Sequence, residues 1–412
     1  MNQDVSTLEC STTEPACTDP LEPRVYREIV ATMALTGHKW DIQMGDTAVL
    51  APYAMTISEG TWRTLAVQAE ALAGELLDAE AEVAERPELW RYLGVPARLR
   101  DVLGRREPWT PSATRVMRFD FHPTAAGWRI SEVNSDVPGG FNEASTFTAL
   151  MEVQFRGLRA AGDPLAVLAK SLAKSVGPGQ CAALLSAPGY LEDHQVVSGV
   201  SAKLREFGVQ SVRTHPDHVL WRDGCAWVDM GGEAVEAGVV YRFFQAEWVT
   251  RLREGEWGGL FRGGRTPVCN PGTSALSESK RLPVIWPRLA TPMPTWRRLL
   301  PRTRSPWRAA FDSSSPCIRK TAYCNTGDVV VSRAWSGSGR WLASMADSLL
   351  RPGSWIVQDQ FQSAPIDGPE GPVHVCLGVY VIDGRAAGIY GRASRRPAID
   401  FMAQDLAVLI RD

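Results

Sequence analysis

Two neighbouring stretches decide the fold: Arg118-Phe119-Asp120, and Glu132-Val133-Asn134-Ser135-Asp136-Val137-Pro138-Gly139-Gly140. Residues 114–121 and 127–134 alternate in polarity, which predicts two strands joined by a turn over residues 122–126. Because residues two apart share a strand face, Arg118 and Asp120 point one way and Phe119 points the other. The hairpin then brings Asp120, Glu132 and Asn134 onto one face.

Three oxygen donors on one face suit a hard cation such as Mg²⁺, which binds carboxylates and amide oxygens and often shares substrate phosphates. Asp120, Glu132 and Asn134 are therefore the candidate metal ligands. Arg118, beside them, is suited to a phosphate oxygen. The alternative is a salt-bridged hairpin that faces solvent and binds nothing.

A polar, glycine-rich loop follows the hairpin and leads into a helix that we expect over about 142–160. Its candidate substrate-binding residues are Ser135, Asp136, Gly139 and Gly140. A loop that feeds a helix N-terminus can hold an anionic substrate group, because backbone N–H groups and the helix dipole favour negative charge.

The composition excludes several classes of protein. The chain has 412 residues, 44 basic and 46 acidic side chains and a net charge of −2, which argues against a general nucleic-acid binder and against a disordered chain. The eight cysteines form no C-x-x-C pair, and no apolar run is long enough to span a membrane. The N-terminus shows no secretory signal. We therefore expect a cytoplasmic protein with no membrane contact.

Lysine is scarce, with only six residues: Lys39, Lys170, Lys174, Lys203, Lys280 and Lys320. Lys320 ends a strand expected over 316–321, before a turn that contains Asn325, Thr326 and Gly327. Small-residue turns let backbone N–H groups approach phosphates, and a lysine supplies a point charge. Lys320 and the turn are therefore candidate nucleotide contacts, with a plain β-hairpin as the alternative.

The last part of the chain alternates strands and helices. A helix is expected over 340–350, strands over 329–332, 354–361, 373–382 and 386–392, and a final helix over 399–410. Gln358 lies in a half-apolar strand, where an amide can hydrogen-bond an adenine edge. Arg392 ends a strand and could stabilise charge on a transferring phosphoryl group.

The predicted fold class is α/β, and the expected organisation has six parts. These are a flexible tail (1–22), a helical region (23–110), the hairpin and its helix (111–165), an α/β substrate lobe with some parallel pairing (166–280), a basic connector (281–310) and a nucleotide-binding part (311–412). The connector could bind an anionic partner, even RNA. The favoured interpretation is an excursion whose tryptophans pack on the body while its arginines reach solvent.

Together and in this order, the motifs resemble the glutathionylspermidine synthase family of ATP-grasp ligases in its circularly permuted form. The matching stretches are RFD at 118–120, EVNSDVPGG at 132–140, YRFF at 241–244, NPGTSALSESK at 270–280, RKTAYCNTGD at 319–328, WIVQDQF at 355–361 and GIYGRAS at 388–394. The carboxylate hairpin precedes Lys320 in the chain, as the permuted family would have it. The resemblance implies a permuted ATP-grasp core with an additional pre-ATP-grasp-like lobe.

The resemblance also implies roles. Asp120, Glu132 and Asn134 match magnesium ligands, and Arg118 and Arg392 match catalytic, phosphate-side arginines. Lys320 and Gln358 match nucleotide contacts. The family has a second nucleotide lysine shortly before the adenine strand; none lies there in this chain, and Arg351 is the expected substitute.

The implied function is ATP-dependent ligation with ATP and two Mg²⁺ ions. A small-molecule or peptide carboxylate becomes an acyl phosphate, and an amine displaces phosphate to leave an amide. A phosphotransferase that stops at the phosphorylated product and a non-catalytic nucleotide-binding relative are the alternatives.

Overall fold

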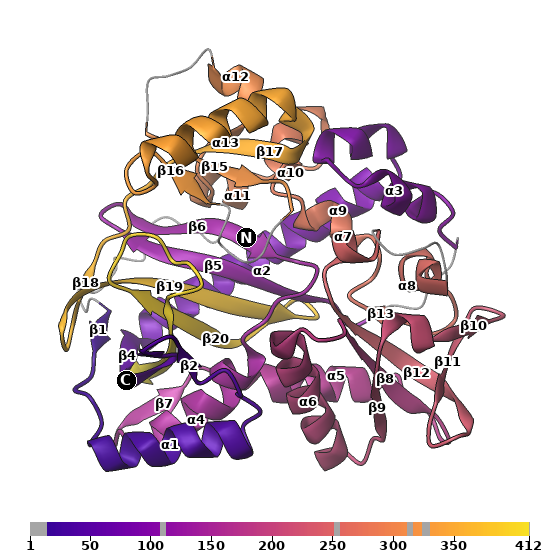
Figure 1. The fold of residues 1–412 in the computed structure, drawn as a ribbon, viewed down its shortest axis with the longest axis horizontal. Coiled ribbons are helices and arrows are strands. Elements are labelled where there is room, and N and C mark those ends of the chain that lie inside the picture. Colours follow the sequence, from indigo (N-terminus) through magenta and orange to yellow (C-terminus); the bar gives the residue numbers. More distant parts are fainter. Residues whose placement is uncertain (1–14, 108–112, 251–255, 311–315, 324–329, 412) are drawn as a thin grey trace, which may run out of the picture.

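The computed structural model describes residues 15–107, 113–250, 256–310, 316–323 and 330–411. The strands of its largest sheet are β1 (Ala16–Cys17), β4 (Leu50–Ser58), β5 (Val116–Thr124), β6 (Gly127–Asn134), β7 (Leu158–Ala160), β18 (Ile366–Gly368), β19 (Gly371–Ile382), β20 (Arg385–Ser394) and β21 (Gln404–Arg411). Their order is β1-β4-β21-β20-β19-β5-β6, with β7 paired to β21 and β18 to β19 (Figure 1).

The hairpin predicted from the alternating pattern is confirmed. Asp120 of β5 lies opposite Glu132 of β6, and Arg118 lies opposite Asn134. The register shifts between Asp120 and Phe121, so that Phe121 pairs with Ile130. The hairpin therefore presents its polar set from the edge of the sheet.

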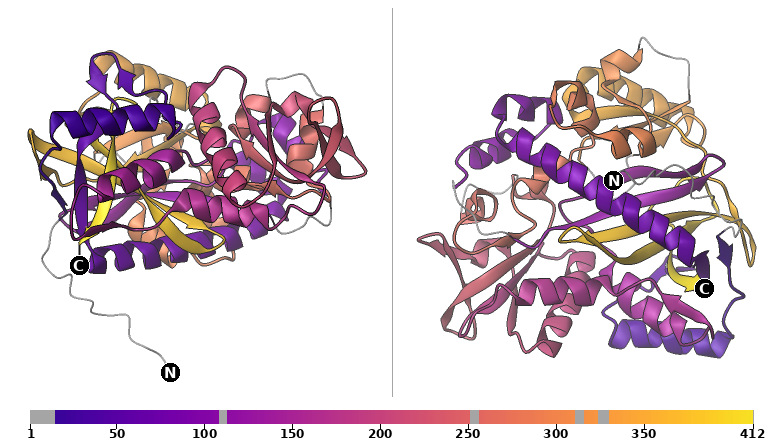
Figure 2. Two further views of the ribbon diagram at one scale, coloured as in Figure 1. Left: turned by 90° about the horizontal axis from the view of Figure 1, so that it is seen from below. Right: turned by 180° about the vertical axis from the view of Figure 1, so that it is seen from behind.

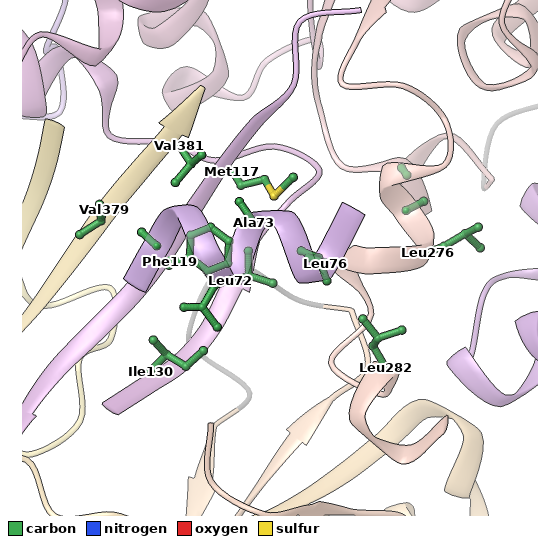
Figure 3. Packing of buried hydrophobic residues seen from close by; sticks show 14 of the residues in the cluster. Leu72, Ala73, Leu76, Met117, Phe119, Ile130, Leu276, Leu282, Val379 and Val381 are labelled. Atoms are coloured by element: carbon green, nitrogen blue, oxygen red, sulfur yellow. The ribbon is translucent and has the colours of Figure 1, made fainter. Parts of the chain in front are cut away.

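The opposite face of the sheet packs on the long helix α2 (Glu59–Ala84), which crosses behind it (Figure 2, right). Ser58 caps this helix by accepting a hydrogen bond from the Thr61 N–H at 3.1 Å. Buried residues recur along it at steps of three and four, as expected for one apolar face. Figure 3 shows Leu72, Ala73 and Leu76 of the helix among the sheet residues Met117, Phe119, Ile130, Val379 and Val381.

A second lobe holds a six-stranded sheet. Its elements are α5 (Pro164–Ala173), β8 (Cys181–Ser186), α6 (Leu191–Glu206), β9 (Ser211–Thr214), β10 (Leu220–Arg222), β11 (Cys225–Asp229), β12 (Ala234–Phe243) and β13 (Val268–Cys269). β8 pairs in parallel with β9 and β12, and β12 in parallel with β13, which confirms the expected parallel pairing. Between this lobe and the large sheet lies a core that includes Tyr380, Phe141 and Tyr241.

A four-stranded sheet with two flanking helices lies over the hairpin (Figure 1). Its elements are β14 (Thr303–Arg304), α12 (Pro306–Ala310), β15 (Cys317–Thr321), β16 (Val331–Ser332), α13 (Ser338–Leu350) and β17 (Trp355–Asp359). The strand order is β14-β17-β15-β16, so the Lys320 strand is central. The helix expected over 340–350 and the strand over 354–361 are confirmed.

The final helix expected over 399–410 is wrong, because most of these residues belong to the strand β21 and residues 399–403 precede it without helical structure. Residues Asp405 to Ile410 are all buried, and β21 pairs in parallel with β4 and antiparallel with β20. A central strand buried on both faces reads as a continuous apolar run without a period of two. The sequence pattern therefore could not distinguish this strand from a helix.

The helix expected over 142–160 is also shorter than predicted. A π-helical turn η2 (Glu143–Phe147) and α4 (Thr148–Glu152) end before β7, because Gly157 turns the chain with a φ of +78°. The region expected to be helical over 23–110 contains α1 (Pro23–Leu35), α2 and a short α3 (Ala97–Leu103), but it also supplies β4. Within the expected tail, residues 1–14 lie outside the described residues, and β1 pairs with β4.

The basic connector is irregular and packs on the body. Its helical turns include α10 (Leu282–Ile285), η5 (Trp286–Arg288) and α11 (Pro294–Leu299). Trp286 and Trp296 are buried, as expected, and the Trp296 indole N–H donates to the Leu72 carbonyl of α2 at 2.9 Å. Trp307 is exposed instead. Within the described residues, no helix is both long enough and apolar enough to cross a membrane.

Candidate functional site

The floor of the site is the polar face of β5 and β6. The Arg118 guanidinium donates from Nε to Asp120 Oδ1 at 2.8 Å and from Nη2 to Asp120 Oδ2 at 3.0 Å. The Asn134 amide donates to Asp120 Oδ2 at 3.2 Å. Burial works against the charge on Arg118, but the facing Asp120 carboxylate holds the pKa of Arg118 well above its ordinary value. The structure thus joins three of the predicted residues in one buried group.

Gly378 of β19 explains how Arg118 can lie across the sheet. It pairs with Asp120, and a Cβ at this position would lie 2.6 Å from Arg118 Cδ. Any side chain here would therefore displace the guanidinium from Asp120. The glycine keeps the sheet open at the point where the arginine crosses it.

Two lysines converge on Glu132 from above. Lys320 Nζ of β15 lies 3.2 Å from Glu132 Oε2 and donates to the Ser131 carbonyl at 3.1 Å. Lys280 Nζ lies 3.7 Å from the same carboxylate oxygen. Burial disfavours the charged carboxylate, but Lys280 and Lys320 lower the pKa of Glu132 to about 2. Glu132 is therefore ionised at neutral pH. It joins the floor to the four-stranded sheet above it, which forms the roof of the site.

Lys280 was missed as a site residue, although it lies in one of the recognised motifs. It follows α9 (Ser274–Glu278), and its backbone N–H donates to the Ala322 carbonyl just beyond β15 at 3.0 Å. This contact between distant segments sets the second lysine beside the first. The scarcity of lysine was the one signal that could have identified it.

A cavity of about 900 Å³ lies between the sheet and the roof. The floor residues that line it are Arg118, Asp120, His122, Ser131, Glu132, His374, Cys376, Gly378, Tyr390 and Arg392. The roof contributes Lys320, and Arg340 and Arg396 also line the cavity, so five basic side chains face three acidic ones there. This excess of positive charge suits a polyanion.

A smaller cavity of about 30 Å³ adjoins the first. Ser131, Glu132 and Lys320 line both cavities, and Lys280 and Gln358 line only the smaller one. Gln358 Nε2 donates to Thr303 Oγ1 at 3.1 Å, while its buried Oε1 accepts no hydrogen bond within the described structure. A buried amide oxygen without a donor is the group expected to accept from a ligand N–H.

The donor set at the hairpin fits a hard cation. Among the described residues, no group of three or more His, Cys, Asp and Glu side chains is arranged to hold a metal ion, so a site at the hairpin would need another oxygen donor, such as the Asn134 amide. Asp120 and Glu132 face each other directly across the strands, and Arg118, Lys280 and Lys320 offset their repulsion. Two carboxylates and an amide oxygen are typical magnesium ligands.

Arg392 lies on the floor, two strands away from β5. Its Nη2 donates to the Asp400 carbonyl at 2.7 Å and to the Ala403 carbonyl at 3.4 Å. Its Nε is buried without a hydrogen-bond partner among the described residues. Arg392 thus lines the same cavity as Arg118.

The loop after the hairpin is more deeply buried than a ligand-binding loop was expected to be. Glu278 Oε2 accepts the N–H groups of Ser135 at 2.7 Å and Asp136 at 2.9 Å. The Asp136 carboxylate is paired with the buried Arg242 guanidinium and accepts from Ser274 Oγ at 2.6 Å. Ser135 and Asp136 therefore hold the loop against the second lobe, and a substrate contact by either stays a prediction.

The two glycines of the loop face the arginine instead. The Gly139 carbonyl accepts from Arg118 Nη1 at 2.8 Å. Gly140 has a φ of +87°, and a Cβ there would lie 2.8 Å from the Tyr390 ring. Both residues fix the surroundings of Arg118, and their contact with substrate also stays a prediction.

The structure does not place Arg351, the expected substitute for a second nucleotide lysine, in the lining of either cavity. The Arg351 side chain is 73% exposed and pairs with Asp347 at 3.3 Å, and Arg351 is not among the described residues that line the two cavities. Lys280 is the second lysine beside Glu132. The predicted contacts Asn325, Thr326 and Gly327 lie outside the described residues.

Comparison with known proteins shows the family and the fold of the chain. A family model described as glutathionylspermidine synthase preATP-grasp matches residues 24–411. None of the functionally curated proteins matches the chain. A solved structure of a glutathione synthetase-like effector from Globodera pallida, in its apo form, is 11% identical with a TM-score of 0.62, over 94% of this chain and 97% of that one.

A putative gamma-glutamylcysteine synthetase from Methylobacillus flagellatus KT is 10% identical with a TM-score of 0.38, over 80% of this chain and 88% of that one. The similarity to the effector shows a shared fold of mixed α/β architecture. Because the family model extends from residue 24 to residue 411, the chain belongs to the glutathionylspermidine synthase family of ligases.

Proposed function

We propose that this protein is an ATP-dependent ligase that joins a small-molecule or peptide carboxylate to an amine. One observation carries the proposal: Arg118, Asp120, Glu132 and Asn134 on the floor meet Lys280 and Lys320 at the junction of two cavities. Carboxylates for a divalent ion beside cations for phosphates are what phosphoryl transfer from a nucleotide requires.

The nucleotide is assigned to this junction. Lys280 and Lys320 would bind its phosphates, and the free acceptor of Gln358 would receive a hydrogen bond from the adenine amino group. Asp120, Glu132 and Asn134 would hold two Mg²⁺ ions, which neutralise the phosphates and polarise the transferred group. The amide of Asn134 carries an oxygen opposite the nitrogen that now contacts Asp120, so a half-turn presents a metal ligand.

The reaction then follows from charge and position. A carboxylate oxygen of the first substrate attacks the terminal phosphorus of ATP, and ADP leaves with the bond's electron pair. Arg118 and Arg392, which both line the cavity, stabilise negative charge on the transferring group. The amine nitrogen attacks the acyl carbon and loses a proton, and inorganic phosphate leaves. The protein positions both substrates and excludes water, since an acyl phosphate hydrolyses readily.

The test is an ADP-release assay on the purified chain with Mg²⁺, using pools of carboxylic acids and amines. The expected result is ADP release that requires both pools, with a product heavier by the amine less one water. Asp120→Asn should abolish it, while Asp367→Asn, at an exposed position, should not. Failure to bind ATP and to release ADP with every pool would refute the proposal.

The same assay separates the alternatives. A phosphotransferase would give a stable phosphorylated product without any amine. A non-catalytic relative would bind nucleotide or partner without turnover, and Asp120→Ala would leave its partner binding intact.

A further inference from the structure

A buried charge cluster lies behind the cavity, and no role in the proposed reaction has been assigned to it. Lys39, in the loop after α1, points its ammonium at three carboxylates: Asp41 at 3.1 Å, Glu143 of η2 at 2.7 Å and Asp405 of β21 at 3.0 Å. Lys39, Glu143 and Asp405 are each no more than 9% exposed. One ammonium group thus forms ion pairs with three carboxylates from three separate segments.

Such a cluster contributes little to the free energy of folding by itself. Burying charges costs more than their attraction returns unless the geometry is well satisfied. Burial raises the pKa of Glu143 even though Lys39 lies beside it. By contrast, Asp405 and Glu143 outweigh burial and hold the pKa of Lys39 well above its ordinary value. The cluster is therefore anchored on a charged lysine.

The loop that carries Lys39 is itself fixed in place. The Asn142 amide, next to Glu143, donates to the His38 carbonyl at 3.0 Å and to the Gln195 carbonyl of α6 at 3.0 Å. The Gln195 side chain in turn accepts from the Asp41 N–H at 3.2 Å. The ammonium therefore enters the cluster from a defined direction.

Tyr390 connects this cluster to the cavity. Its hydroxyl donates to Asp405 Oδ1 at 2.5 Å, and Arg118 Cζ lies 5.2 Å from the centre of its ring. Tyr390 lines the cavity, whereas Lys39 and Asp405 are not among the described residues that line it. Asp405 also lies opposite Arg392 in the register of β20 and β21. Arg118 and Arg392 are the two arginines assigned to phosphoryl transfer. Arg118 therefore has Tyr390 as a neighbour in this chain of contacts, and Arg392 has Asp405.

We propose that Lys39 and Asp405 are positioning residues that act through Tyr390. Lys39 holds the Asp405 carboxylate, Asp405 holds the Tyr390 hydroxyl, and the Tyr390 ring supports the Arg118 guanidinium over the floor of the cavity. A cation above an aromatic ring is attracted to its face, so the ring orients Arg118 without touching substrate. The inference rests on the proposed ligase function. It adds that turnover requires Lys39 and Asp405 to hold Tyr390 beside Arg118.

Tyr390→Phe is the decisive variant, because it keeps the ring and removes only the hydrogen bond to Asp405. Once active substrates are found, we expect kcat to fall about tenfold while KM for ATP changes less than about twofold, since a small displacement of a positioned group lowers turnover. Tyr190→Phe is the matched control. Tyr190 donates from its hydroxyl to Glu192 Oε2 at 3.2 Å and lines neither cavity among the described residues, so loss of this hydroxyl should leave kcat unchanged.

Lys39→Met and Lys39→Arg complete the experiment. Lys39→Met should lower kcat at least as much as Tyr390→Phe, and adding Tyr390→Phe to it should lower kcat little further. Lys39→Arg should restore much of the activity, because it returns the charge. If Lys39→Met does not fold, Tyr390→Phe and Lys39→Arg still decide the question.

Two results can be told apart. If the wild-type chain releases ADP but Tyr390→Phe has the kcat of Tyr190→Phe, the positioning role is refuted and the ligase function stands. If the wild-type chain releases no ADP with any acid and amine, the proposed function fails, and the positioning role fails with it.

Discussion

Removal of Lys280 is the sharpest test of how the nucleotide site is built. Lys280 Nζ lies 3.7 Å from Glu132 Oε2, so their attraction is about 4 to 5 kcal/mol at the effective dielectric constant of about 20 that applies to such sites. Lys320 contacts the same carboxylate at 3.2 Å and keeps Glu132 ionised when Lys280 is lost. The main loss in Lys280→Met is therefore one cation beside the nucleotide phosphates.

A charge-assisted hydrogen bond contributes about 1.5 to 3 kcal/mol, and 1.4 kcal/mol corresponds to a factor of ten in affinity. Because Glu132 already shares the Lys280 charge, the lower part of that range applies. We expect the Kd of the chain for ATP with Mg²⁺ to rise about tenfold in Lys280→Met. Isothermal titration calorimetry measures this without knowledge of the acid or the amine.

Lys170→Met is the matched control, because Lys170 is an exposed lysine of α5. Its Kd should equal that of the wild-type chain, which shows that loss of one positive charge from the surface is not enough. Equal ATP affinity in Lys280→Met and wild type would refute the assignment of the phosphates to the junction of the two cavities.

Three further predictions test other parts of the structure. Arg351→Ala should leave ATP affinity unchanged, because this side chain is 73% exposed and is not among the described residues that line either cavity; weaker ATP binding in a calorimetric titration would show that Arg351 contacts the nucleotide. Leu409→Ala, in the fully buried part of β21, should lower the free energy of unfolding by about 2 to 5 kcal/mol in urea denaturation, and a surface-like cost would contradict the strand. Burial raises the pKa of Asp193 to about 7, above its unfolded value of about 3.9, so this carboxyl makes the fold less stable as pH rises from about 4 to 7. Asp193→Asn should therefore raise the melting temperature at pH 8 but not at pH 4, and equal shifts at both pH values would show that ionisation is not the cause.

The hairpin was predictable because its information is local. Alternation along 114–121 and 127–134 places Arg118 and Asp120 on one face and Phe119 on the other, and a short turn fixes the pairing of Asp120 with Glu132. The prediction required only the pleat of a strand and the length of a turn. The same reasoning located the strand that carries Lys320.

Contacts between distant segments were not predictable in this way. The place of Lys280 depends on the loop after α9 docking beside β15, through its hydrogen bond to Ala322. The burial of Asp136 depends on Arg242 of β12, in the other lobe. No spacing in the chain encodes either distance, so neither the position of Lys280 nor the burial of Asp136 could be predicted.

The position of Glu132 shows why chain order and site geometry can be separated. Its carboxylate faces Asp120 on the floor, Lys320 on a strand reached much later in the chain, and Lys280 on a third segment. These partners are brought together by packing of the four-stranded sheet over the hairpin, not by adjacent positions in sequence. A permuted chain can therefore keep the same site as long as both layers survive. It also follows that any motion lifting β15 from the hairpin would separate Lys320 from Glu132 and take apart the junction at which both cavities meet.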